Sequence, residues 1–209
     1  VLEKIWLQHY PAGVPAEINP SEYRSLRELI EQSIAQHRDR PCFTCMDRTL
    51  TYGDLDVLAS RFAAYLQQVA RLRKGDRIAL MLPNVLQYPV AILGTFRAGL
   101  TIVNTNPMYT PRELQHQLHD SGARAILILE NFAHTLAEVQ HDVHLDTVIV
   151  TGVGDLLAFP KSLLVNFVLR HVKKQVPEYS LPGAVSLTEA LSKGRYENLE
   201  RIELGHEDI

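Results

Sequence analysis

The sequence has no apolar run long enough to cross a membrane. No uninterrupted apolar stretch among its 209 residues reaches the roughly 18–20 residues that a spanning helix needs. The first residues, Val1 to Trp6, lack the basic segment and apolar core of a secretory signal. Only two cysteines are present, which fits a reducing compartment. Together these absences predict a cytoplasmic protein.

An excess of basic charge is also missing. Lys and Arg total 21 against 24 Asp and Glu, so the formal net charge is −3. There is no basic patch with interleaved aromatic residues and no nucleic-acid-binding motif, so nucleic acid is not an expected partner. The hydrophobic fraction of 46% and the charged fraction of 22% are ordinary for a globular protein.

What is present is an alternation of strand and helix patterns between Asp76 and Leu129. The strand patterns are continuous apolar runs, which is typical of a parallel sheet covered by helices on both faces. The connections are short, as in right-handed crossovers. We therefore predict an α/β fold with an open, mainly parallel sheet flanked by helices. The expected strands and helices are, in order, 77–82, 88–98, 100–103, 110–121 and 125–129.

Local signals define two of the expected helix starts. Thr110 can cap one N-terminus, and Glu113 completes a capping box three residues later. Gly122 suits the left-handed conformation that often follows a helix end. The same pattern recurs at Thr51, where Asp54 takes the position usually held by Glu.

The rest of the chain divides into an arm and one domain. Residues 1–20 are rich in proline and predict an extended arm, whereas residues 21–209 predict a single α/β domain. A small β-hairpin is expected over 41–52, with its turn at Asp47-Arg48. Further helices are expected at 21–38, 51–66, 131–140 and 163–174, and a further strand at 147–150, while the remainder of 152–200 is expected to be less regular.

Two short motifs resemble ligand sites but lack the required partners. Cys42 and Cys45 have the spacing of a redox pair or half a zinc site, yet on a strand they would point to opposite faces. Gly152 and Gly154 mimic a dinucleotide-binding turn, but Leu157 stands where the third glycine belongs. We favour incidental thiols and a plain strand-exit turn, and keep a dinucleotide-binding domain as a distant alternative.

The nine histidines include two pairs with a spacing of three residues. His116 and His119 lie on an expected helix, and His141 and His144 in an expected loop. Two ligands on one helical turn can begin a metal site, but neither pair has a third ligand at suitable spacing. Surface histidines are the favoured interpretation, and no metal is expected to bind the chain itself.

Asn104, Asn106 and Tyr109 follow the carboxyl end of an expected parallel strand. Ligands of open α/β sheets tend to bind at that edge, so these residues are candidates for a pocket wall. The alternative is a turn in which the Asn side chains satisfy local backbone groups. No catalytic residue is expected within the chain.

The segment from Leu156 to Pro177 is strongly apolar and then turns basic. An apolar helix with a cationic end can lie in a membrane interface and attract anionic lipid. The alternative is a helix packed on the domain, with a solvated basic end that favours the helix dipole. The expected membrane contacts are Leu163, Leu164, Phe167, Arg170, Lys173 and Lys174.

Several longer strings resemble the core motifs of one enzyme family. LTYGDL at 50–55 is similar to its first core motif, and the stretch from RAG at 97–99 to NTNP at 104–107 is similar to its second. The strings PNVLQYPV at 83–90, NPMYT at 106–110 and YPAGVPAEINP at 10–20 resemble the bacterial long-chain fatty-acid–CoA ligases within that family. The family is that of the adenylate-forming (acyl-activating, AMP-binding) enzymes.

The resemblance implies a two-step ligase. A fatty acid and ATP with Mg form an acyl-adenylate and pyrophosphate, and coenzyme A then attacks the acyl carbon. Fatty acid and CoA are thus the implied substrates, and such chemistry rests on positioning and on neutralising phosphate charge. The expected location is cytoplasmic, and a peripheral position on the inner face of the cytoplasmic membrane is kept as an alternative.

One part of the family pattern is missing. The Thr/Gly-rich loop with a Lys that grips phosphate in this family has no counterpart here, so we expect an N-terminal fragment without ligase activity. Surface exposed by such a truncation could also pair two copies into a homodimer. Two alternatives stay open: an adenylate-forming ligase for a medium-chain or aromatic carboxylate, and a non-enzymatic membrane-docking or interaction module.

Overall fold

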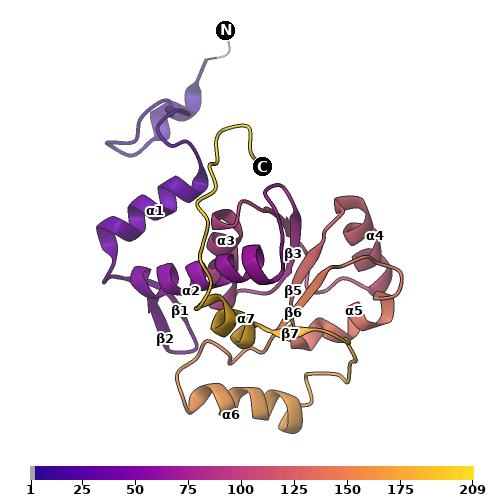
Figure 1. Cartoon of the computed structure of the whole chain (residues 1–209). Coiled ribbons are helices and arrows are strands. Elements are labelled where there is room, and N and C mark those ends of the chain that lie inside the picture. Colours follow the sequence, from indigo (N-terminus) through magenta and orange to yellow (C-terminus); the bar gives the residue numbers. More distant parts are fainter. Residues whose placement is uncertain (1–2) are drawn as a thin grey trace.

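A computed structural model describes residues 3–209 and contains one five-stranded sheet, one two-stranded hairpin and a set of helices (Figure 1). The elements are η1 (Ile5–His9), α1 (Leu26–His37), β1 (Pro41–Cys45), β2 (Arg48–Thr51), α2 (Tyr52–Ala64), η2 (Tyr65–Val69), β3 (Arg77–Met81), α3 (Gln87–Arg97), β4 (Thr101–Asn104), α4 (Pro111–Ser121), β5 (Ala125–Leu129), η3 (Glu130–Phe132), α5 (Ala133–Val139), β6 (Thr147–Thr151), α6 (Lys161–Phe167), η4 (Val168–Val172), β7 (Val185–Ser186) and α7 (Leu187–Gly194).

All strands of the larger sheet run parallel, in the order β4-β3-β5-β6-β7. Strand β5 is central, and all five of its residues are buried, as its continuous apolar sequence requires. The prediction of an open parallel sheet flanked by helices, with a separate antiparallel hairpin of β1 and β2, is therefore confirmed.

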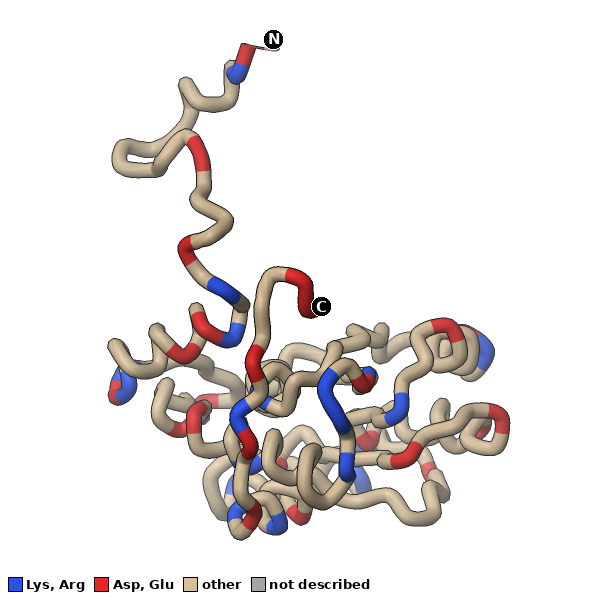
Figure 2. The backbone as a smooth tube through the Cα atoms, turned by 45° about the horizontal axis from the view of Figure 1, so that its top comes forward, with Lys and Arg blue, Asp and Glu red and all other residues tan. Residues whose placement is uncertain are grey.

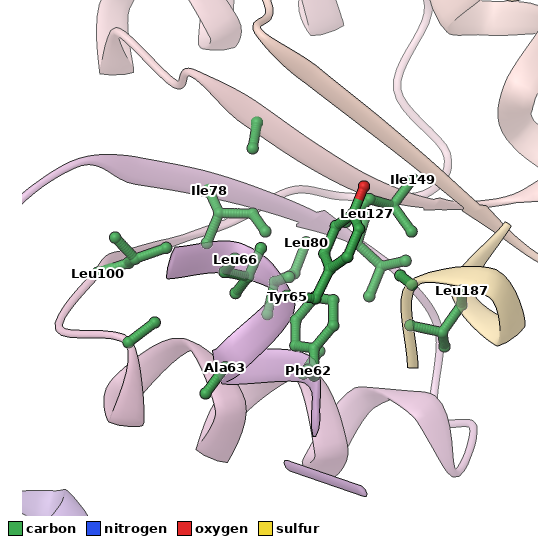
Figure 3. Packing of buried hydrophobic residues seen from close by; sticks show 14 of the residues in the cluster. Phe62, Ala63, Tyr65, Leu66, Ile78, Leu80, Leu100, Leu127, Ile149 and Leu187 are labelled. Carbon is green, nitrogen blue, oxygen red and sulfur yellow. The ribbon is translucent and has the colours of Figure 1, made fainter. Parts of the chain in front are cut away.

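Alternate residues of the strands pack into two separate hydrophobic cores, one on each face of the sheet. In β3, Leu80 packs with residues of α2 and α7 on one face of the sheet, whereas Met81 packs with residues of α4 and α5 on the other. Figure 3 shows Phe62 and Leu66, from the α2–η2 helix, beside the first face. Burial on both faces explains why neither face of the strand sequence is polar.

Both capping boxes have the expected geometry. The Thr110 side chain accepts from the backbone N–H of Glu113, whose carboxylate accepts from the N–H of Thr110 at 2.9 Å. The pair Thr51 and Asp54 forms the same reciprocal bonds at the start of α2. Gly122 ends α4 with φ of +60°, the left-handed conformation that glycine adopts without penalty.

Other boundaries differ from the sequence expectations. The first helix starts at Leu26, because Ser25 caps it by accepting from the N–H of Glu28. The hairpin turn lies at Met46 and Asp47, both with positive φ, one residue earlier than expected. Two residues with positive φ match the twist of the flanking strands, so β2 can begin at Arg48.

The cysteine pair also departs from expectation. The register of β1 shifts between Pro41 and Phe43, and such a bulge breaks the alternation of side chains. As a result Cys42 and Cys45 both pack against the same core cluster, beneath α2. The prediction that they point to opposite faces is wrong. Burial raises the pKa of the Cys42 thiol, while a hydrogen bond with Tyr52 lowers it to a smaller extent.

The two ends of the described chain are extended. The segment before α1 contains only the short turn η1, which buries no residue, and it leads away from the sheet in Figures 1 and 2. The last residues run along α1 and η2, where Gln67 hydrogen-bonds the backbone of Glu200 and Lys74 pairs with Asp208 at 2.8 Å. The proposed domain boundary at residue 20 stays a prediction. Within residues 3–209, no helix combines the length and apolar character needed to span a bilayer.

Candidate functional site

A buried carboxylate lies at the carboxyl end of the central strand. Glu130 directly follows β5 and is only 1% exposed. Its Oε2 accepts from Nε of Arg170 at 2.8 Å and from Nη2 at 2.5 Å. Hydrogen bonding to Glu130 raises the pKa of Arg170, against the effect of partial burial. This ion pair links η4 to the carboxyl end of the sheet.

A polar cavity of about 440 Å³ lies next to this pair. Burial is the main cause that raises the pKa of Tyr179, and the charge of Glu130 adds to it. Among residues 3–209, Glu130 Oε1 has no hydrogen-bond partner. Part of the cavity lining is Glu130, Asp155, Asn166, Arg170, Tyr179 and Ser186.

The N–H groups of Gly152 and Gly154, in the turn after β6, are both hydrogen-bonded within the chain. The Gly152 N–H donates to the Asp155 carboxylate at 2.8 Å, and the Gly154 N–H donates to Asn166 Oδ1 at 2.7 Å. A Cβ on Gly154 would lie 2.5 Å from the Ser162 carbonyl oxygen, so α6 packs directly on the turn. This agrees with the strand-exit interpretation, because the two glycine N–H groups, which a phosphate-binding turn would offer to its ligand, are already used.

The nucleotide and Mg expected from the resemblance do not fit the residues described. The N–H groups of both turn glycines are already hydrogen-bonded, and within residues 3–209 no three His, Cys, Asp or Glu side chains lie close enough together to hold a metal ion. The ring of His119 instead contacts the Asp142 carbonyl oxygen at 2.8 Å. No step that uses ATP is therefore assigned to these residues.

An apolar cleft of about 520 Å³ separates the α6–η4 helix from the ends of β5 and β6. Its lining is almost entirely aliphatic and aromatic, and Lys173 is the only charged residue in it. The full lining is Met46, Leu129, Asn131, Phe132, Val153, Leu164, Val165, Val168, Leu169, Lys173 and Gln175.

The predicted pocket-wall residues lie at the far edge strand of the sheet. Asn104 ends β4, and its Oδ1 accepts from the Tyr88 hydroxyl at 2.7 Å. Asn106 Oδ1 accepts from the N–H of Met108, and the Tyr109 N–H donates to the Asn106 carbonyl. The bonds of Asn106 and Tyr109 are those of a local turn, whereas the bond of Asn104 links β4 to α3. None of the three residues lines either cavity described above. Their role in a pocket wall stays a prediction.

The predicted membrane residues separate into two groups. Leu163, Leu164 and Phe167 are 64%, 61% and 56% exposed, and Lys173 and Lys174 are exposed beyond the helix end. Arg170 instead points to Glu130, as part of the ion pair described above. Its predicted contact with a membrane stays untested. The helix is continuous from Lys161, and its last turn, η4, has π geometry.

Sequence reasoning missed the carboxylate at the centre of this site. Glu130 stands directly after a continuous apolar strand, which is a local sign of a charge at the ligand-binding edge of the sheet. Its partner Arg170 lies 40 positions later, and no sequence spacing announces that contact. No sequence pattern identifies Asp155 and Asn166 either, because their hydrogen bonds to the glycine turn form only in the folded structure.

Residues 30–187 match the family described as AMP-binding enzyme. A protein of Escherichia coli O157:H7 named long-chain-fatty-acid–CoA ligase is 51% identical over 208 residues, which is 100% of this chain and 37% of that protein. A protein of the same name from Bacillus subtilis is 35% identical and covers 78% of this chain and 29% of its own length. The chain thus spans about 37% of the first of these curated relatives.

Solved structures share the fold at low sequence identity. A long-chain-fatty-acid-CoA ligase from Archaeoglobus fulgidus superposes with a TM-score of 0.68 at 21% identity, covering 96% of this chain and 35% of that chain. An anthranilate CoA ligase in complex with anthranoyl-AMP gives 0.70 at 16% identity, covering 91% and 32%. The family match covers most of the chain. The chain belongs to the AMP-binding enzyme family.

Proposed function

We propose that this chain is the amino-terminal part of a long-chain fatty-acid–CoA ligase. The observation that carries the proposal is the similarity, over the full length of this chain, to bacterial proteins of that name. Ligases of this family use ATP, Mg and CoA. In the proposed reaction the fatty-acid carboxylate attacks the α-phosphate of ATP and releases pyrophosphate. The CoA thiolate then attacks the acyl carbon and releases AMP.

The chain would serve that reaction as a scaffold. Its glycine turn is occupied by Asp155 and Asn166, which supports placing the nucleotide grip in other residues of the complete protein. What the chain supplies is a rigid parallel sheet whose carboxyl edge holds the Glu130–Arg170 pair and the cleft beside α6.

Acid selectivity tests the proposed substrate against its nearest rival. The complete protein encoded by the gene would be given hexadecanoate, octanoate and 4-coumarate in competition, with ATP, Mg and CoA, and the thioesters separated by mass. Hexadecanoyl-CoA should dominate. Preference for octanoate or the aromatic acid would replace the proposal with a ligase for another carboxylate, a class represented by a 4-coumarate–CoA ligase relative from Pinus taeda.

We also propose that the outer face of α6 docks on an anionic membrane. Leu163 and Phe167 are four residues apart, so they share one face of the helix, and both are more than half exposed. Lys173 and Lys174 follow at the end of the same helix. Apolar side chains can enter the acyl boundary while nearby lysines meet anionic headgroups.

Vesicle co-sedimentation tests this docking. The charge-reversal pair Lys173→Glu and Lys174→Glu should weaken binding to phosphatidylserine-containing vesicles by tenfold or more, because each lysine near such a surface contributes about 1 kcal/mol. Leu163→Ser with Phe167→Ser should also weaken it. Leu26→Ser, an equally exposed leucine on α1 (64%), is the matched control. Unchanged binding in both double variants would rule out docking through this face.

A further inference from the structure

The α6–η4 helix presents a second apolar face, turned toward the protein. Val165, Val168 and Leu169 line the cleft of about 520 Å³ described above, at the spacing of one helix face. Opposite them lie Leu129, at the end of β5, and Phe132. This inner face is distinct from Leu163 and Phe167, which do not line the cleft.

The cleft is not filled by the side chains around it. Its volume lies within the roughly 300–1,000 Å³ of small-molecule sites. Val165, Val168 and Leu169 are only partly buried, so the cleft leaves apolar surface in contact with water. An apolar ligand would gain free energy by covering that surface.

The cleft has few polar lining residues, namely Asn131, Lys173 and Gln175. Lys173 is the only charged lining residue, and it forms no salt bridge with any of residues 3–209. Asn131 Nδ2 donates to the Gln175 carbonyl at 2.9 Å. Its Oδ1 is buried and has no partner within residues 3–209. Buried acceptors are normally satisfied. A carboxylate has no hydrogen to donate, so a water bridging the ligand and Asn131 would satisfy this oxygen.

We propose that this cleft binds a free fatty acid. The acyl chain lies between the inner face of the α6–η4 helix and the end of β5, and the carboxylate pairs with Lys173. An aliphatic lining with one cation and no acidic residue complements that ligand, since the like charge that would repel a carboxylate is absent. The inference rests on the proposed function and deepens it, by giving the acid a holding site next to the helix that faces the membrane.

Titration of the 209-residue chain with fatty acids, in the absence of vesicles, tests the site. Octanoate, decanoate and dodecanoate would be titrated as monomers by calorimetry, with amide chemical shifts mapping the contacts. Affinity should rise about fourfold for each added methylene. Dodecanol should bind more weakly than dodecanoate, because it lacks the charge that pairs with Lys173. Shift changes that leave Val165, Val168 and Leu169 unaffected would overturn the proposed location.

Matched variants distinguish binding in the cleft from non-specific attraction between a lysine and the carboxylate. Lys173→Gln should weaken dodecanoate binding about tenfold, whereas Lys174→Gln, outside the cleft, should leave it unchanged. Val168→Trp should fill the cleft and abolish binding, whereas Val172→Trp, 66% exposed and outside the lining, should not. Thermal unfolding would verify that each variant is folded. If Val168→Trp does not fold, the comparison of Lys173→Gln with Lys174→Gln decides whether dodecanoate binds in the cleft.

The outcomes distinguish this proposal from the proposed function. Equal dodecanoate affinity in Lys173→Gln and Lys174→Gln would overturn the cleft site, even if the complete protein forms acyl-CoA. A complete protein without acyl-CoA formation would overturn the ligase proposal, and specific binding in the cleft would still identify a fatty-acid site.

Discussion

Glu130 carries a buried carboxylate at the candidate site. Its side chain is almost fully enclosed, and Arg170 is the only one of residues 3–209 that forms a salt bridge with it. A buried ion pair adds little net stability when intact, but removing one partner leaves a charge that water cannot reach. Glu130 therefore makes Arg170 a structural requirement for the position of η4, rather than one more surface cation.

Arg170→Ala tests that dependence. The variant should lose about 3 kcal/mol of unfolding free energy, at the low end of the range for a broken buried pair, because Arg170 itself is half exposed. Lys174→Ala, an exposed cation four residues later, should change it by less than about 0.5 kcal/mol. Chemical denaturation measures both, and equal stability of the two variants would show that Glu130 is neutralised by other means.

At the scale of elements, Asp56 of α2 joins three helical segments. Its carboxylate accepts from Arg38, which follows α1, at 2.9 Å, and from Arg97 of α3 at 2.8 Å. Burial pushes the pKa of Asp56 upward, but the hydrogen bonds and charges of the two arginines outweigh it, so the pKa is lowered. The ionised form is thus favoured in the folded protein.

The sign of this shift gives a pH-dependent prediction. Asp56→Asn should cost about 2 kcal/mol at pH 7. Since the folded pKa lies below the unfolded value of about 3.9, the advantage of wild type should persist above pH 4 and fade as pH drops through the folded pKa. Denaturation at pH 7, 5 and 3 measures it, with exposed Asp39→Asn as control. A deficit that stays constant to pH 3 would contradict the assigned network.

The elements also show which features sequence could predict. The capping boxes at Thr51 and Thr110 depend on residues three positions apart, and the strands announce themselves as unbroken apolar runs. By contrast β7 is only two residues long and exists because β6 pairs with it. The Glu130–Arg170 contact, the closed glycine turn and the cleft behind α6 likewise arise from tertiary packing, which no local pattern encodes.

Across the whole molecule, the proposed functional features lie where β5 and β6 end. That edge carries the Glu130–Arg170 pair, the cleft, and a helix whose two faces differ in exposure. The opposite edge is occupied by the terminal residues packed along α1 and η2. The proposed acyl-binding cleft and the proposed membrane-docking face thus both belong to the α6–η4 helix, while the N–H groups of Gly152 and Gly154 are already hydrogen-bonded within the chain.

ATP-dependent formation of hexadecanoyl-CoA tests this account most directly. The assay would compare the 209-residue chain with the complete protein encoded by the gene, at equal concentration with ATP, Mg, CoA and hexadecanoate, and would follow thioester and AMP together. We predict thioester and AMP in equal amounts from the complete protein and neither from the chain alone. Hexadecanoyl-CoA made by the chain alone, or none made by the complete protein, would contradict the account.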